Sequence, residues 1–204
     1  MINPFIGLAG NIGSGKTTFT KFISQSQKWT PFYEPVSDNP YLKDFYNDMP
    51  RWGFNLQIYF LHKRFEMHKK MSEIKVGVVQ DRTIYEDKEI FAKNLFDMKK
   101  ISKRDWENYS GLFSAMSSFL KKPDLVIYLK ASTDTLLKRI KSRNRDFERD
   151  IDPEYLRTLN TAYNKWIDKE KEYPVLVIDT DNFNIYKDQQ SFKEIENKIL
   201  KTLL

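Results

Sequence analysis

A glycine-rich loop near the amino terminus carries the clearest chemical signal in this sequence. It fits the pattern G-x-x-x-x-G-K-[ST], in which backbone N–H groups surround phosphate oxygens, the lysine reaches the β- and γ-phosphates and the next hydroxyl can bind Mg²⁺. We therefore predict that a nucleoside triphosphate and Mg²⁺ bind at Gly10, Asn11, Ile12, Gly13, Ser14, Gly15, Lys16, Thr17 and Thr18.

The residues on either side of this loop fit the structure that the motif needs. Residues 5–9 are a short apolar run that predicts a buried strand, and residues 18–23 predict the opening of a helix. A helix that begins at such a loop aims its dipole and its free N–H groups at a bound anion. The alternative, a chance glycine turn, does not explain a strand and a helix in both flanking positions.

Two further charged positions follow predicted strands. Glu34 ends the apolar run 31–34, and a carboxylate there could take a proton from a hydroxyl nucleophile, although a surface glutamate explains it equally well. Asp81 and Arg82 follow the run 76–80. An acid in this place commonly helps to hold Mg²⁺, and the arginine could stabilise charge on a transferred phosphoryl group.

Polar side chains recur at helical spacing in a helix predicted over 51–71. Gln57 and Arg64 are two turns apart and therefore share a face of that helix. With Asp87 nearby they could contact the edge of a nucleobase, because glutamine offers a donor and an acceptor and arginine a fixed fork of donors. A plain polar helix face explains the same spacing.

A dense group of charges lies further along the chain. Arg139 and Arg143 are four residues apart on one predicted helix face, and Arg145 and Glu148 follow in the charged stretch 143–150. An arginine lid that closes on a triphosphate would exclude water and stabilise charge. The alternative is a solvated basic helix end.

Five apolar runs predict one parallel sheet in an α/β fold. Continuous rather than alternating apolar residues in three of them are typical of strands covered on both faces. Helical patterns separate the runs, which predicts right-handed crossovers and a single domain over 1–204. Ligands of such sheets bind at the carboxyl ends of the strands, so we expect the polar residues above to meet there. The runs are 5–9, 31–34, 76–80, 125–129 and 175–178.

Composition excludes several other classes of protein. The net charge of +6 suits anionic ligands, but no block of like charges predicts an arm for a nucleic acid polymer. The absence of cysteine excludes disulfides, thiolate metal sites and a cysteine nucleophile, and two histidines cannot form a His-rich metal site. No run has the length of a membrane span or the form of a signal peptide, so we expect a cytoplasmic protein.

Taken in order, these pieces resemble the deoxyribonucleoside kinase family, which contains the deoxycytidine, deoxyguanosine and deoxyadenosine kinases. The similarity extends nearly from end to end. It implies a P-loop kinase fold, with a five-stranded parallel sheet flanked by helices and an arginine-rich lid at about 143–150. The matching residues are 10–18, Glu34-Pro35-Val36, Tyr46, Trp52 with Gln57, Asp81-Arg82-Thr83 with Asp87, Arg139, Arg143, Arg145, Glu148 and Tyr155-Leu156.

The resemblance also implies a role for each matching residue. Glu34 would be the base that activates the 5′-hydroxyl of the sugar, Arg82 would contact that hydroxyl and the reacting phosphate, and Asp81 would lie near the metal. The other implied roles are the base edge for Gln57, Arg64 and Asp87, packing on the base for Phe91, the sugar 3′-hydroxyl for Tyr46 and Glu148, the lid for Arg139, Arg143 and Arg145, and the donor adenine for Phe183.

On this resemblance we expect ATP- and Mg²⁺-dependent phosphorylation of a deoxyribonucleoside in nucleotide salvage. Deoxyadenosine is favoured over deoxyguanosine or deoxycytidine by similarity to small bacterial purine deoxynucleoside kinases. The family also implies a homodimer through helices at 51–71 and 88–121. Thr83 stands where the family usually has serine, and Phe147 where relatives often carry a second acid.

Two alternatives differ in testable ways. A nucleoside monophosphate kinase similar to thymidylate kinase shares the loop, but it would need extra basic residues for the acceptor's phosphate, where this chain offers aromatics and Gln57. A GTP-binding switch protein needs D-x-x-G and N-K-x-D. No aspartate here has glycine three residues later. In Asn164-Lys165-Trp-Ile-Asp168 two residues separate the lysine from the aspartate, whereas the motif has one.

Overall fold

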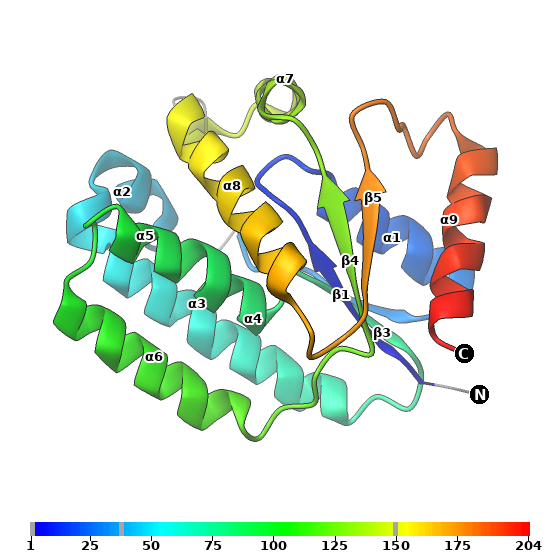
Figure 1. The fold of residues 1–204 in the computed structure, drawn as a ribbon, viewed down its shortest axis with the longest axis horizontal. Helices are drawn as coiled ribbons and strands as arrows, with labels where there is room; N and C mark the ends of the chain where they lie inside the picture. The colour runs from blue at the N-terminus through cyan, green and yellow to red at the C-terminus, as the bar shows by residue number, and fades with distance from the viewer. Residues whose placement is uncertain (1–2, 37–38, 149–150) are drawn as a thin grey trace.

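A five-stranded parallel sheet runs through the middle of the molecule (Figure 1). The computed structural model describes residues 3–36, 39–148 and 151–204. The strand order is β2-β3-β1-β4-β5, so the chain crosses over between non-adjacent strands as expected for a doubly wound α/β fold. The strands are β1 (Phe5–Ala9), β2 (Thr30–Phe32), β3 (Val78–Asp81), β4 (Leu125–Lys130) and β5 (Val175–Asp179).

The register of the central strands aligns their carboxyl ends. Leu8 of β1 lies opposite Asp81 of β3, and Ala9 lies opposite Tyr128 of β4. The loop that leaves β1 therefore emerges beside the end of β3. This alignment brings the two strongest sequence motifs to one edge of the sheet.

Helices cover both faces of the sheet, and alternate residues of β4 show which helices cover which face. Leu125, Ile127 and Leu129 belong to an apolar cluster with Phe19 and Phe192, from helices α1 (Lys16–Gln27) and α9 (Gln189–Thr202). Val126 and Tyr128 belong to the other cluster, with residues of α3 (Met49–Ser72), α6 (Lys103–Ser117) and α8 (Pro153–Lys169). Figure 1 shows these two helical layers on either side of the strands. Burial on both faces explains why the strands are continuous apolar runs.

Short capping motifs set where several helices begin. The side chain of Asp48 accepts a hydrogen bond from the backbone of Arg51 at the start of α3, and Ser102 caps α6 through Asp105 in the same way. The helices are α1 (Lys16–Gln27), α2 (Leu42–Asn47), α3 (Met49–Ser72), α4 (Ile84–Glu86), α5 (Lys93–Asp97), α6 (Lys103–Ser117), α7 (Thr133–Arg143), α8 (Pro153–Lys169) and α9 (Gln189–Thr202), with a 3₁₀ turn at Asp146–Glu148.

Three details differ from the sequence prediction. The second strand is Thr30–Phe32 rather than 31–34, because it is an edge strand that pairs only with β3 and the chain turns away before Glu34. Asp81 is the last residue of β3 rather than the first residue after it. Residues Asp87–Ala92 form a π-helical stretch between α4 and α5, a type of distortion that is frequent at functional sites.

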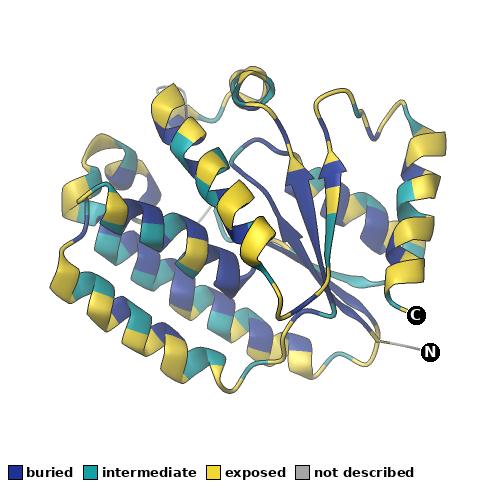
Figure 2. Ribbon diagram, viewed as in Figure 1, coloured by how far each residue is buried: buried dark blue, intermediate teal, exposed yellow. Residues whose placement is uncertain are grey.

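Burial follows the layers. Figure 2 shows strands that are largely buried and helices whose outer faces are exposed. Within the three described ranges, no helix combines the length and the hydropathy that a membrane span requires.

Candidate active site

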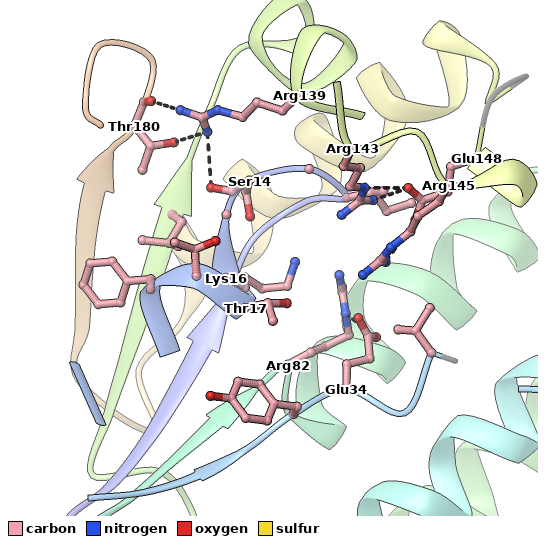
Figure 3. Close-up of a pocket in the computed structure, with 18 of the residues that line it drawn as sticks. Ser14, Lys16, Thr17, Glu34, Arg82, Arg139, Arg143, Arg145, Glu148 and Thr180 are labelled. Atoms are coloured by element: carbon pink, nitrogen blue, oxygen red, sulfur yellow. Dashed lines mark hydrogen bonds and ion pairs between the residues drawn. The ribbon is translucent and has the colours of Figure 1, made fainter. Parts of the chain in front are cut away.

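A cavity of about 790 Å³ opens at the carboxyl ends of the strands (Figure 3). This volume lies within the range of sites that enclose small organic ligands. The glycine loop and Thr180 line one part of it, and α2, α3 and the π-helical stretch line the other. Most of the predicted phosphate-binding and acceptor-binding residues therefore share one cavity, whereas Gly10, Asn11, Arg64 and Asp81 are not part of its lining.

Backbone geometry explains the glycines of the loop. Gly13 has φ 85°, and a Cβ atom there would lie 3.1 Å from the carbonyl oxygen of Leu136 and 3.0 Å from the side chain of Ile140. The loop thus packs directly against α7 at a point where no side chain fits. Helix α1 begins at Lys16, so its free N–H groups face the cavity.

The side chain of Lys16 is buried within the glycine loop. Its Nζ atom donates to the carbonyl oxygens of Gly10 at 2.7 Å and Asn11 at 3.1 Å. Burial, and to a lesser extent the positive charge of Arg82, lower the pKa of Lys16 to about 8. The amine is thus mostly protonated at neutral pH and close to phosphate oxygens that would bind in the loop.

Thr17 and Asp81 form a pair at the mouth of the loop. The Thr17 hydroxyl donates to Asp81 Oδ2 at 2.6 Å, and Asp81 Oδ1 is buried with no hydrogen-bond partner. Burial raises the pKa of Asp81 despite the charge of Lys16. A hard divalent cation prefers hydroxyl and carboxylate oxygens, so an unpartnered carboxylate oxygen beside a threonine hydroxyl fits Mg²⁺.

Glu34 is held between two arginines. Its Oε1 atom accepts a hydrogen bond from Arg64 Nη2 at 2.8 Å and lies 2.8 Å from Arg82 Nε, an ion pair without hydrogen-bond alignment. Burial alone would raise the pKa of Glu34, but the charges of Arg82 and Arg64 outweigh it and lower the pKa to about 2. The carboxylate is ionised at neutral pH, as a proton acceptor must be.

The position of Arg64 differs from the sequence expectation. Its side chain is fully buried, and its guanidinium donates to Asp87 Oδ2, to the carbonyl oxygen of Arg82 at 2.8 Å and to Glu34. Arg64 is absent from the lining of the cavity, whereas Gln57 and Asp87 are part of it. Arg64 thus connects Glu34 to Asp87, and its direct contact with a base stays a prediction.

Gln57 and Asp87 carry groups suited to a polar ligand edge. The Oε1 atom of Gln57 is buried with no hydrogen-bond partner in this structure. Burial raises the pKa of Asp87 to about 6, against the opposing charge of Arg64. Phe91 lines the same part of the cavity, and the Arg82 guanidinium carbon lies 4.2 Å from its ring centroid. Tyr46 also lines the cavity.

The arginines of the predicted lid are held in two different ways. Arg139 donates to the carbonyl oxygen of Ser14 at 3.3 Å and to Thr180 Oγ1 at 3.1 Å, so it is attached to the loop and to the end of β5. Arg143 and Arg145 instead pair with Glu148. In Figure 3 Arg145 and Arg82 extend into the cavity from opposite sides. Residues 149 and 150 of the predicted lid lie outside the described residues.

Phe183 lines the cavity together with Thr180, and the family resemblance implies a contact with the donor adenine there. Its side chain is partly buried against the apolar cluster of α1 and α9. This placement is compatible with the predicted contact without testing it.

Glu86 and Tyr163 were not predicted from the sequence. Glu86 Oε1 accepts from Arg82 Nη1 at 2.8 Å, from the backbone N–H of Gly10 at 3.3 Å and from the Tyr163 hydroxyl. Glu86 follows Arg82 by four residues, the spacing of an ion pair on a helix, and this was the available signal. Tyr163 lies 77 residues further along, and no local pattern marks it.

The arrangement brings an ionised acid, Arg82 and the glycine loop around one cavity. Phosphoryl transfer depends almost entirely on positioning and charge stabilisation, and these groups supply both. The site therefore fits transfer of a phosphoryl group from a triphosphate to a hydroxyl that reaches Glu34.

Comparisons of the sequence with known proteins agree with this chemistry. The family model described as deoxynucleoside kinase matches residues 6–204. The deoxyadenosine/deoxycytidine kinase of Bacillus subtilis (strain 168) is 38% identical over 203 residues, which cover 98% of this chain and 94% of the relative. The deoxyadenosine kinase of Dictyostelium discoideum is 42% identical over 179 residues, covering 87% of this chain and 73% of the relative.

Solved structures give the same match in three dimensions. A deoxyadenosine kinase from M. mycoides with the products dCMP and a flexible dCDP superposes with a TM-score of 0.86 and 32% identity, covering 97% of this chain and 99% of that one. The deoxyadenosine kinase from M. mycoides with bound dATP gives a TM-score of 0.83 and 30% identity, with 94% and 98% covered.

Proposed function

This chain belongs to the deoxynucleoside kinase family, and we propose that it transfers the γ-phosphoryl group of ATP to the 5′-hydroxyl of deoxyadenosine in preference to deoxyguanosine or deoxycytidine. The observation that carries the proposal is the Glu34 carboxylate, held by Arg64 and Arg82 in the same cavity as the phosphate loop. An acid in that place can serve a hydroxyl acceptor directly.

In the proposed mechanism the ionised Glu34 accepts the proton of the 5′-hydroxyl. The 5′-oxygen forms a bond to the γ-phosphorus, the bond from that phosphorus to the β,γ-bridging oxygen breaks, and ADP leaves. Lys16 would stabilise the charge of the transferred group from the phosphate loop, and Arg82 would do so from beside Glu34 on the acceptor side. Little covalent work falls to the protein, so its main contribution is to hold both substrates in line.

Thr17 and Asp81 would hold Mg²⁺, which neutralises phosphate charge when it is bound. The support is the buried and unpartnered Asp81 Oδ1 beside the Thr17 hydroxyl. Phosphate oxygens and water would complete the coordination, as is usual for this ion.

The choice of base is proposed from the polar groups at the far end of the cavity. The unpartnered Gln57 Oε1 needs a donor, and the exocyclic amino groups of adenine and cytosine supply one. Thymine carries a carbonyl oxygen in place of that amino group, so it presents a different order of donors and acceptors to Gln57 and Asp87. A base whose order does not match would leave buried polar groups unpaired, so thymidine is expected to be a poor substrate.

A substrate panel tests the proposed function. The purified protein is incubated with ATP and Mg²⁺ and with each of the four deoxynucleosides, and the 5′-monophosphates are measured by chromatography. We expect the highest kcat/KM for deoxyadenosine, and a preference for thymidine would contradict the base assignment. Faster turnover of dAMP than of deoxyadenosine would favour the monophosphate kinase alternative, and tight GTP binding without transfer would favour the switch protein.

We also propose a homodimer that acts in nucleotide salvage in the cytoplasm. Helix α6 carries Leu112 with 41% of its surface exposed, which is compatible with an interface there. Sedimentation velocity at several concentrations would test the dimer, and a monomer at every concentration would contradict it.

A further inference from the structure

Arg82 has an unusual backbone conformation for a residue so close to the chemistry. Its φ angle is 70°, in the left-handed region that side chains with a Cβ rarely adopt. Such a conformation costs free energy and persists only where surrounding contacts hold it. The contacts that hold Arg82 in this conformation therefore help to set its position in the site.

Two carboxylates hold Arg82 from opposite sides. Glu34 lies at the cavity, with 18% of its side chain exposed, and faces the Nε atom. Glu86 is fully buried behind the arginine and accepts from Nη1 at 2.8 Å. The same Nη1 atom donates to the Tyr163 hydroxyl at 2.9 Å. Arg82 thus keeps two partners that lie away from the cavity when Glu34 interacts with a substrate.

Glu86 also reaches the phosphate loop. Its Oε1 atom accepts from the N–H of Gly10 at 3.3 Å, while the Tyr163 hydroxyl lies 2.9 Å from the carbonyl oxygen of Gly10. One carboxylate oxygen therefore contacts both Arg82 and the first residue of the loop. Arg82 Nη2 also donates directly to the carbonyl oxygen of Gly10 at 3.4 Å, so Glu86 adds a second, shorter link between Arg82 and the loop.

We infer that Glu86 is a positioning residue for phosphoryl transfer, which with Tyr163 holds Arg82 in register with the phosphate loop and leaves Glu34 free to take the proton of the acceptor. The inference rests on the proposed function, because it assigns Glu86 to that reaction. Glu86 touches no substrate in this scheme and acts through Arg82.

The substitutions Glu86→Ala and Glu86→Gln test the role together. Alanine removes both contacts of Oε1, so we expect kcat to fall on the order of 10²-fold, the size of loss that a small misplacement of a reacting group causes. Glutamine keeps an oxygen acceptor for Arg82 and Gly10, so it is expected to recover much of that loss. KM for ATP and for the nucleoside should change less than threefold, because neither substrate contacts Glu86.

A double-mutant cycle separates positioning from general damage. If Glu86 acts through Arg82, then Glu86→Ala should cost almost nothing further in an Arg82→Ala background. Glu89→Gln, an exposed acid three residues further on, serves as the matched control and should leave kcat unchanged. Thermal unfolding of each variant reports whether the protein is folded. Should Glu86→Ala fail to fold, Glu86→Gln and Tyr163→Phe carry the test, with an expected loss in kcat of about tenfold for the phenylalanine variant.

The outcomes are distinct. Absence of deoxynucleoside turnover by the wild-type protein would overturn the proposed function and this inference with it. An active wild type with near-normal kcat in folded Glu86→Ala, or with fully additive losses in the cycle, would overturn the inference alone. If Glu86→Ala does not fold, near-normal kcat in both folded Glu86→Gln and Tyr163→Phe would overturn it. A large non-additive loss in kcat with rescue by glutamine supports it.

Discussion

Arg64 and Arg82 lie inside the protein with side chains 0% and 4% exposed, whereas Arg143 and Arg145 are 32% and 38% exposed. Between them, the two buried arginines contact three carboxylates and several backbone oxygens. Among the described residues, Arg143 and Arg145 both pair with one carboxylate, Glu148.

This contrast separates a part of the site that is already assembled from a part that can rearrange. Buried arginines have given up their hydration during folding, so their position is fixed before a ligand arrives. Exposed arginines keep water and a weak partner, and they can exchange that partner for phosphate at little cost. On the proposed roles, the acceptor side would be preorganised, whereas Arg143 and Arg145 would take up their final positions only around bound phosphate.

Replacement of Glu34, the acid held by the two buried arginines, is expected to have the largest effect on activity. Glu34→Gln keeps the shape but cannot take a proton, so kcat should fall about 10²- to 10⁴-fold, the usual contribution of a general base. Equilibrium binding of ATP should stay nearly unchanged. Steady-state kinetics and calorimetry measure the two quantities, and Glu66→Gln on the exposed side of α3 is the control. Near-normal turnover of Glu34→Gln would show that another group takes the proton.

Arg64 gives the largest expected effect on stability. Arg64→Met leaves Asp87 and Glu34 without their shared partner, and removal of one member of a buried ion pair typically costs about 3–5 kcal/mol. Arg143→Met breaks a half-exposed pair and should lower the free energy of unfolding by less than ~1 kcal/mol. Urea denaturation of both variants checks the comparison. Equal losses would mean that burial does not distinguish the two pairs.

The exposed arginines are expected to matter moderately and in a salt-dependent way. Arg143→Lys or Arg145→Lys keeps the charge but loses the forked geometry, so kcat/KM for ATP should fall about tenfold, or ~1.4 kcal/mol. Higher ionic strength should reduce the difference between variant and wild type, because exposed charges are screened. Identical salt dependence in Arg82→Lys, where the arginine is buried, would contradict the distinction.

The pH dependence of ATP capture gives the smallest predicted effect near neutral pH. Burial lowers the pKa of Lys16 to about 8, so its amine loses its charge as the pH rises through that value. The kcat/KM for ATP, which reports the free enzyme, should therefore decline above about pH 8 by up to tenfold per unit. Lys16→Arg should have lower activity but no such alkaline limb. A flat wild-type profile to pH 9.5 would argue against a buried, charged Lys16 in the free protein.

Most of the fold was predictable because its signals are local. Continuous apolar runs predicted the five parallel strands, and helical spacing predicted α3. The ends of β2 were wrong because pairing with β3, rather than apolar character, decides where an edge strand stops. The π-helical stretch at Asp87–Ala92 has no pattern of its own, since it depends on packing against α3 and α8.

The site was predictable in its residues more than in its contacts. The sequence identified Arg64 and Arg139 as functional candidates, but it could not reveal that Arg64 is buried between two acids or that Arg139 is attached to the loop and Thr180. Such contacts join residues far apart in the chain. The sequence did not predict Glu86, because an acid next to Asp87 looks like an ordinary charge on a helix. Its role depends on contacts with Gly10 and Tyr163, which only the fold brings close to it.

The close packing of Gly13 against α7 limits how the phosphate loop and the arginines of α7 can move relative to each other. The loop lies directly against α7 at Leu136 and Ile140, and Arg139 donates to Ser14, so we expect the loop and the helix to move together. Helix α7 ends at Arg143, and the residue that follows it, Asn144, has a φ of 50°. A closing movement that keeps the contact between Arg139 and the loop must therefore bend the chain at or beyond Asn144. Arg145, which lies beyond Asn144, would move in such a closure, while Arg139 would keep its position beside the loop.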